Sequence, residues 1–199
     1  MIDIIGSPSS NAKSVYFAFK DLGINCRIVT DASDIEESKK IVLPGVGAFG
    51  ALARFINESR FLRALNLRLD EGAKLMGICL GMQMLGESSE ESESEKGLSV
   101  FPLQCRKFKQ DNLRVPHTGW DQVAIYKNHQ ILEGLGSEFS AFFSHSYYIP
   151  SCPQYSLAVT TYGFEFSAVV AKGNVVGVQF HPERSQRNGR RILSNFADW

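Results

Sequence analysis

The sequence lacks several features that would mark particular classes of protein. Its 21 lysines and arginines balance 21 aspartates and glutamates, so no excess of positive charge points to nucleic acid or an anionic membrane as partner. No apolar run approaches the roughly 18 residues that suggest a transmembrane helix, and residues 1–5 open directly as a strand-like segment. We therefore expect neither a signal peptide nor a membrane span.

Cysteine is also sparse, and the four cysteines are scattered without close pairs. This distribution is consistent with a reducing cytoplasm and disfavours a cysteine-based zinc site, and we expect no metal or cofactor. Cys26, Cys105 and Cys152 are interpreted as small apolar side chains of the core or surface. Cys79 stands in a different context, described below.

Hydrophobic residues make up 44% of the 199 residues, which is typical of one globular domain over residues 1–199 with a substantial core. No internal repeat is visible. In the first half, short apolar runs alternate with helical stripes, which predicts an α/β fold: a mostly parallel sheet with helices on both faces. The second half is richer in strands.

The predicted strands cover 2–5, 26–29, 41–43, 75–78, 123–126, 141–143, 147–149, 157–161, 168–171 and 175–180. A helical stripe ends at Gly23, residues 52–69 are mostly helical with a possible break near 57–59, and a last helix carries Ile192, Leu193 and Phe196. The serine- and glutamate-rich run 88–96 is predicted to be a solvated loop.

Cys79 lies in the run Gly-Ile-Cys-Leu-Gly, between an apolar strand and a helix-compatible segment. This is the nucleophile-elbow pattern, with cysteine where hydrolases carry serine. Gly77 and Gly81 provide the small residues that so tight a turn needs, and the following helix would favour the reactive thiolate. Taken alone, the pattern also fits a buried structural thiol.

The segment Gly-Val-Gln-Phe-His-Pro-Glu ends another predicted strand. His181 could exchange a proton with a cysteine, and Glu183 could orient the imidazole, since residues two apart share a face of an extended chain. Pro182 would stiffen this spacing. Alone, the segment could be a simple strand-end turn, but together the two motifs favour a catalytic Cys-His-Glu triad.

These two motifs resemble those of the class I (triad) glutamine amidotransferase family. The segments Pro-Gly-Val-Gly at 44–47 and Pro-His-Thr-Gly-Trp at 116–120 make the chain similar to the glutaminase subunits of imidazole glycerol phosphate synthase. The resemblance covers nearly the whole chain. It implies a flavodoxin-like amidotransferase fold, hydrolysis of glutamine, and transfer of the ammonia to a cyclase/synthase (β/α)8-barrel subunit in a heterodimer.

The resemblance also assigns roles to residues. The tetrahedral intermediate needs preorganised N–H donors, for which the backbones of Leu80 and of Val46 and Gly47 are candidates. The glycines beside Val46 could permit a peptide flip. Taken alone, the segment fits an ordinary glycine turn equally well, but the nearby elbow favours the functional interpretation. The residues implied in glutamine binding are Gln83, Glu91, Ser146 and Tyr147.

Glu91 and the nearby His145 both have plain structural interpretations. Glu91 could equally be a glutamate of a solvated loop. His145, which precedes the Ser146–Tyr147 pair, is more readily a half-buried strand histidine than a catalytic one.

Trp120 and Arg184 are predicted at the interface with the barrel subunit, although a core position would also suit the indole of Trp120. Arg184, Thr118 and Asp121 stand where lysine, methionine and asparagine are usual in the family. Arginine and lysine are not equivalent in an ion pair. The departures therefore leave the partner's identity open at the expected docking face.

Three other interpretations remain. A paralogous glutaminase subunit could supply ammonia to another acceptor, such as a surface-sugar amination enzyme. A non-catalytic subunit is disfavoured by the intact triad. A peptidase or other hydrolase would leave Gln83 and the Pro-His-Thr-Gly-Trp segment unexplained. Because the chain ends soon after the triad, we expect no fused acceptor domain and transfer of the ammonia to another chain.

Overall fold

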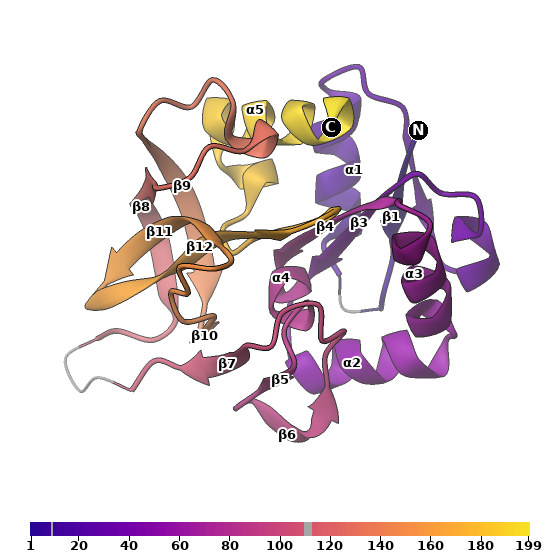
Figure 1. The fold of residues 1–199 in the computed structure, drawn as a ribbon, viewed down its shortest axis with the longest axis horizontal. Helices are drawn as coiled ribbons and strands as arrows, with labels where there is room; N and C mark the ends of the chain where they lie inside the picture. Colours follow the sequence, from indigo (N-terminus) through magenta and orange to yellow (C-terminus); the bar gives the residue numbers. More distant parts are fainter. Residues whose placement is uncertain (9, 110–112) are drawn as a thin grey trace.

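A mixed sheet runs through the centre of the computed structural model, which describes residues 1–8, 10–109 and 113–199. Within these residues its strands follow the order β2-β1-β3-β4-β13-β12-β11-β8-β9 (Figure 1). Neighbouring strands from β2 to β13 pair in parallel, and those from β13 to β9 pair antiparallel. The predicted parallel sheet is therefore confirmed for the first half of the chain, and the second half extends it with antiparallel strands. The strands of this sheet are β1 (Ile2–Ile5), β2 (Cys26–Val29), β3 (Lys40–Gly45), β4 (Lys74–Cys79), β8 (His117–Ile125), β9 (Glu138–His145), β11 (Ser156–Tyr162), β12 (Phe164–Lys172) and β13 (Val175–Val178).

Helices cover both faces of the sheet and define two apolar cores. Residues of α1 and α5 contribute to one core, and residues of α2, α3 and α4 contribute to the other. Figure 1 shows α5, in yellow, beside α1. None of the described helices is long and apolar enough to cross a membrane. The helices are α1 (Ala12–Lys20), α2 (Phe49–Glu58), α3 (Phe61–Asp70), α4 (Leu80–Met84) and α5 (Gln186–Asp198), with short 3-10 turns η1 (Ala32–Ile35), η2 (Gln130–Leu132) and η3 (Pro182–Arg184).

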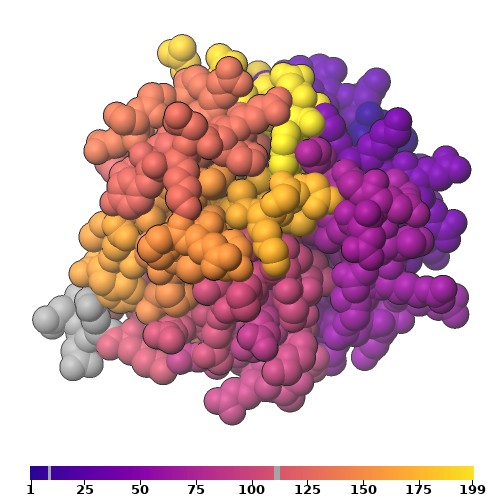
Figure 2. All heavy atoms as spheres, viewed as in Figure 1, coloured from indigo at the N-terminus to yellow at the C-terminus, as the bar shows by residue number. Residues whose placement is uncertain are grey.

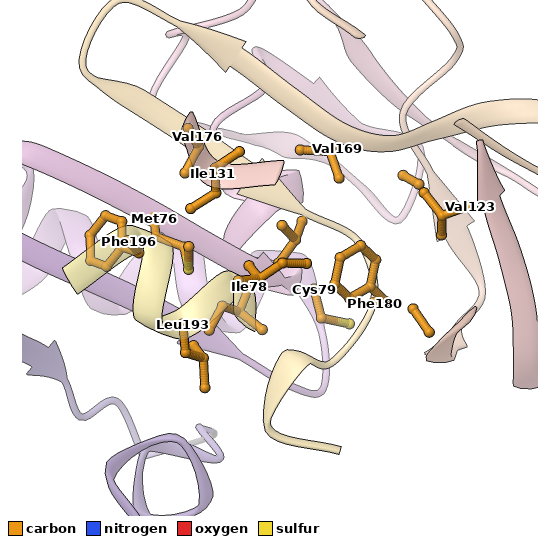
Figure 3. Packing of buried hydrophobic residues seen from close by; sticks show 14 of the residues in the cluster. Met76, Ile78, Cys79, Val123, Ile131, Val169, Val176, Phe180, Leu193 and Phe196 are labelled. Carbon is orange, nitrogen blue, oxygen red and sulfur yellow. The ribbon is translucent and has the colours of Figure 1, made fainter. Parts of the chain in front are cut away.

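The two halves of the chain contribute neighbouring strands to the same sheet. In the space-filling view, yellow-orange atoms of the strand-rich second half lie directly beside purple atoms of the first half (Figure 2). The join is the pairing of β4 with β13, in which Ile78 lies opposite Val178. Figure 3 shows the core beside this pair of strands. Cys79, the last residue of β4, lies next to Phe180 in this view. The parallel pairing brings the ends of the two motif-bearing strands together.

Two sequence predictions about helices are refined by the structure. The helical region 52–69 is two helices, and the predicted break lies at Ser59 and Arg60, where Arg60 adopts a left-handed conformation with φ of 65°. The segment after Cys79 is helical as expected, but α4 spans only five residues.

The serine- and glutamate-rich run is not the solvated loop that composition suggested. It forms β5 (Ser88–Ser89) and β6 (Ser92–Lys96) of a second sheet, completed by β7 (Gln104–Lys107) and β10 (Tyr147–Tyr148) in the order β10-β7-β5-β6. β6 packs against α2, where a Cβ added to Gly50 would lie 2.7 Å from the Ser92 hydroxyl oxygen. Small residues on both sides permit this approach, which a composition-based prediction cannot detect.

Candidate active site

Cys79 ends β4 in a strained backbone conformation. Its φ and ψ are 54° and −109°, a region that residues other than glycine rarely occupy and that is concentrated at functional sites. A Cβ on Gly77 would lie 2.6 Å from the Gly81 carbonyl oxygen, and one on Gly81 would lie 1.8 Å from the Leu43 carbonyl oxygen. The turn therefore requires glycine on both sides of the cysteine, as the elbow pattern predicted.

His181 and Glu183 form a buried pair beside this turn. The distance from His181 Nδ1 to Glu183 Oε1 is 2.8 Å, and both side chains are almost fully buried. The backbone of His181 is anchored to β9, because its N–H donates to the Phe142 carbonyl oxygen at 2.9 Å. Glu183 reaches His181 because residues Pro182–Arg184 form the 3-10 turn η3. The expectation that the two side chains meet on one face of an extended chain is therefore wrong.

Electrostatics place a proton on His181. Burial alone would lower the pKa of His181, but the charge and hydrogen bond of Cys79, with the hydrogen bond and charge of Glu183, outweigh it and raise the pKa to about 10. A histidine held as imidazolium beside a cysteine stabilises the thiolate, which is the nucleophilic form. The geometry thus suits acyl transfer by nucleophilic attack, followed by proton donation to the leaving group.

A cavity of about 670 Å³ opens over these residues. It brings together nearly all the positions singled out from the sequence, from both halves of the chain. They are Val46, Gly47, Cys79, Leu80, Gln83, Glu91, Ser146, Tyr147, His181, Glu183 and Arg184. Trp120 does not line it.

The loop after β3 forms one wall of the cavity. The register of β3 and β4 sets Gly45 opposite Cys79, so the residues that follow, Val46 and Gly47, lie beside the elbow. Gly47 has φ of +87°, which favours glycine. Leu80, directly after the cysteine, lines the same cavity.

Gln83 and Glu91 are both held by protein groups. The Gln83 amide nitrogen donates to the Tyr147 carbonyl oxygen at 2.8 Å and to Gln179 Oε1 at 3.2 Å. The Glu91 carboxylate accepts a 2.7 Å hydrogen bond from the backbone N–H of Phe49, at the start of α2. Glu91 is therefore fixed at the end of the loop that carries Val46 and Gly47.

Among the residues that sequence reasoning did not assign to this site, Asn11 and Gln179 contact the triad through their side chains. Asn11 Nδ2 donates a 2.6 Å hydrogen bond to Glu183 Oε1, the oxygen that also faces His181. The Gln179 amide nitrogen lies 3.8 Å from the Cys79 sulfur. Gln179 had a signal, since it is a polar residue in an apolar strand, whereas Asn11 lies in a turn-rich loop with no motif.

Comparison with known proteins identifies the family. The family described as glutamine amidotransferase class-I matches residues 3–199. The chain belongs to this family.

Relatives of this amidotransferase include curated proteins named imidazole glycerol phosphate synthase subunit HisH. The protein of Halobacterium salinarum is 43% identical, with 95% of this chain and 88% of that protein covered. The protein of Syntrophotalea carbinolica is 38% identical with both chains fully covered. The protein of Pseudomonas aeruginosa, named HisH 2, is 38% identical over 100% of this chain and 99% of its own.

Solved structures agree with the amidotransferase fold. One described as a glutamine amidotransferase superposes with a TM-score of 0.78 at 20% identity, covering 100% of this chain and 99% of that one. One described as PurLQS from Thermotoga maritima has a TM-score of 0.77 at 16% identity, covering 99% of this chain and 97% of that one. At these identities the likeness concerns the fold alone.

The amidotransferase carries an aromatic and cationic group of side chains beside the cavity. Trp120 on β8 is 46% exposed, and its ring meets the Phe142 ring edge-on at 6.0 Å between centroids. The Arg184 guanidinium lies over the same ring, 4.1 Å from its centroid. The core alternative for Trp120 is therefore wrong. We call Trp120, Phe142 and Arg184 the Trp120 patch.

Proposed function

We propose that this chain is the glutaminase subunit of an imidazole glycerol phosphate synthase and acts in histidine biosynthesis. The observation that carries the proposal is the meeting of Cys79 with the His181–Glu183 pair in a cavity of about 670 Å³. The curated relatives that match over their full length and carry that name support the same assignment. We place the activity in the cytoplasm, where its four free cysteines would remain reduced.

Hydrolysis proceeds through a thioester. The Cys79 thiolate attacks the side-chain amide carbon of glutamine, and His181 donates its proton to the departing ammonia. His181 then takes a proton from the water that cleaves the thioester and releases glutamate. Glu183 keeps the imidazole oriented and balances its charge throughout.

The developing oxyanion needs donors placed in advance. The N–H of Leu80 is one, and a second comes from the loop at Val46 and Gly47, beside the elbow. One such donor is typically worth about 3–4 kcal/mol of transition-state stabilisation.

The remaining cavity residues bind the α-amino acid end of glutamine. Gln83 and Glu91 provide acceptors for the ammonium group, and the backbone of Ser146 and Tyr147 meets the carboxylate. All four line the cavity that also contains Cys79.

The ammonia passes to a (β/α)8-barrel cyclase/synthase subunit that docks on the Trp120 patch. Exposed tryptophan and arginine are the side chains most enriched at the energetic centres of protein interfaces. There the acceptor ribonucleotide and ammonia become imidazole glycerol phosphate and the aminoimidazole carboxamide ribotide.

One experiment tests both halves of the proposal. Glutamate release from glutamine is measured for the chain alone and with candidate barrel subunits, and imidazole glycerol phosphate is measured in the same reactions. Glutamate release without imidazole glycerol phosphate would favour a second function, a glutaminase paralogue serving another acceptor such as a sugar amination enzyme. Arg184 in the Trp120 patch, and the relative named HisH 2, are the observations that favour this alternative. Absence of any glutamate release would overturn both.

A further inference from the structure

Two buried histidines that the mechanism does not use lie directly beside the cavity. His117 at the start of β8 and His145 at the end of β9 are paired across the two strands. They are 1% and 6% exposed, and His117 Nδ1 lies 3.0 Å from His145 Nε2. The other ring nitrogens also have partners. His145 Nδ1 lies 2.7 Å from the Tyr147 carbonyl oxygen, and His117 Nε2 lies 2.5 Å from Asp121 Oδ2.

The partners determine where the protons are. A carbonyl oxygen only accepts, so His145 must carry its proton on Nδ1. Burial lowers the pKa of His145 to about 3, so the ring is neutral and its Nε2 is a bare acceptor. His117 must therefore donate from Nδ1. Its Nε2 then faces a carboxylate oxygen at 2.5 Å, and this contact is favourable only with one proton between them.

The surroundings hold His117 in this orientation. Its ring is stacked between Tyr162, at 4.2 Å, and Phe143, at 4.9 Å between centroids. The pKa of His117 is lowered, because burial outweighs the hydrogen bond and charge of Asp121. The proton between His117 Nε2 and Asp121 is therefore inferred from their 2.5 Å contact. The titratable groups facing the two rings are Asp121 and Tyr162, together with the charge of His181 near His145.

The chain of hydrogen bonds ends on a backbone group of the cavity wall. The Tyr147 carbonyl accepts from both His145 Nδ1 and Gln83 Nε2, at 2.7 and 2.8 Å. Two donors on one carbonyl fix the peptide, and Ser146 and Tyr147 both line the cavity. The other end of the chain, the side chain of Asp121, is 36% exposed. It lies next to Trp120 in the sequence.

We propose that Asp121 and His117 are positioning residues for glutamine binding. They share one proton, and through His145 they hold the Ser146–Tyr147 segment in the conformation that receives the substrate carboxylate. The proposal rests on the proposed glutaminase function for the identity of the ligand. The chain of hydrogen bonds and its protons are inferred from the geometry alone and do not depend on that function.

The proton chain is tested without substrate. In ¹⁵N-histidine NMR spectra of the full chain, His145 should be neutral with its proton on Nδ1, and His117 should show a proton on Nδ1 and a second one shared between Nε2 and Asp121. In Asp121→Asn, the new amide donates to a bare Nε2, so His117 should become neutral with its proton on Nδ1. A proton on His145 Nε2, or a His117 spectrum unchanged by Asp121→Asn, would overturn the proposal.

The positioning role is tested by glutamine binding in a Cys79→Ser background, which prevents turnover. Asp121→Leu should weaken glutamine binding roughly three- to tenfold, the loss expected for one net hydrogen bond. Asp121→Asn should restore most of it, because its amide keeps the chain closed. His129→Gln is the matched control, since His129 contacts Trp199 away from the cavity. Equal affinities for Asp121→Leu and the parent would refute the positioning role. If the parent itself binds no glutamine, the proposed function fails, and the NMR result still decides the proton chain.

Discussion

Asn11 donates a 2.6 Å hydrogen bond to the Glu183 oxygen that also receives the His181 Nδ1 contact. The carboxylate is thus held from two directions, by the loop before α1 and by the imidazole. Asn11 Oδ1 and Glu183 Oε2 are buried, and neither has a partner among the described residues. The Cys-His-Glu arrangement therefore extends to a fourth residue.

Asn11→Ala should reduce kcat for glutamine hydrolysis roughly tenfold or more. The change removes one hydrogen bond to a charged group, worth about 1.5–3 kcal/mol, and leaves Glu183 free to turn from His181. Steady-state glutamate production checks this. Ser10→Ala, in the same loop, is the control, because the Ser10 hydroxyl donates to the Ser7 carbonyl and, among the described residues, to no group of the triad. Equal kcat for Asn11→Ala and the parent would show that Glu183 needs no second partner.

Cys79→Ala should abolish glutamine hydrolysis, while the thermal melt and binding to a partner stay near those of the parent. Cys79 is the cysteine that lines the cavity beside His181. Cys152→Ala is the control, since Cys152 is a half-buried cysteine outside that cavity. Substantial glutamate formation by Cys79→Ala would overturn its assignment as nucleophile.

His181→Ala should be as inactive as Cys79→Ala, whereas Glu183→Gln should retain more activity. An orienting group can contribute less than the nucleophile or the base, as triad proteases illustrate. The comparison is made by kcat for glutamine, with added ammonia tested separately through the partner. A His181→Ala enzyme that still hydrolyses glutamine would contradict the triad.

Much of this arrangement could be predicted from the sequence, and the physical reasons for the remainder are specific. Strand ends and turn glycines are local features, so the elbow at Cys79 and the pair His181–Glu183 were visible as patterns. Their meeting depends on β4 pairing with β13, which the pattern of each strand by itself does not predict. Asn11 reaches Glu183 through tertiary packing alone, and no local pattern marks it.

The incorrect prediction for residues 88–96 has a similar cause. A run of serine and glutamate is typical of solvated chain, yet Ser92 packs at Gly50 of α2 and Glu95 pairs with Arg54 at 3.1 Å. The strand β8 was predicted too short for another reason. In its first residues, exposed side chains (Thr118, Trp120 and Gln122) alternate with buried or half-buried ones (His117, Gly119 and Asp121). Apart from Trp120 none of these residues has a large apolar side chain, so no apolar run marks the start of the strand.

The buried His145 should make stability depend on pH on the acid side. Its folded pKa is lowered to about 3, against about 6.5 in an unfolded chain. Below pH 6.5 the unfolded state binds a proton that the native state excludes, so stability falls as pH falls from 6.5 towards 3. His145→Gln should reduce this slope by at most about 1.4 kcal/mol per pH unit. Denaturant unfolding at pH 7 and pH 5 checks the difference, and identical slopes would show that His145 is protonated in the native state.

The isolated chain should hydrolyse glutamine slowly and should be activated by its barrel partner with bound ribonucleotide. The loop at Val46 and Gly47 lies between β3, whose end faces Cys79, and α2, whose first N–H is held by Glu91. A flip of one peptide there would move an N–H donor into or out of the oxyanion site. A missing donor costs about 10²–10³ in rate, and docking on the Trp120 patch would shift the population of the loop.

Two variants separate this switch from a simple loss of function. Proline fixes φ near −65°, whereas Gly47 stands at +87°, so Gly47→Pro should prevent the flip and remove stimulation by the partner. Glu91→Gln should keep the stimulation, because its amide oxygen can still accept from the Phe49 N–H, while glutamine binding weakens. Glutamate formation is measured for the chain alone, with partner, and with partner and ribonucleotide. If the lone chain is fully active and no partner changes its rate, there is no switch. If Gly47→Pro is still stimulated, activation reaches Cys79 by another route, for which the β5–β6 segment against α2 is the next candidate.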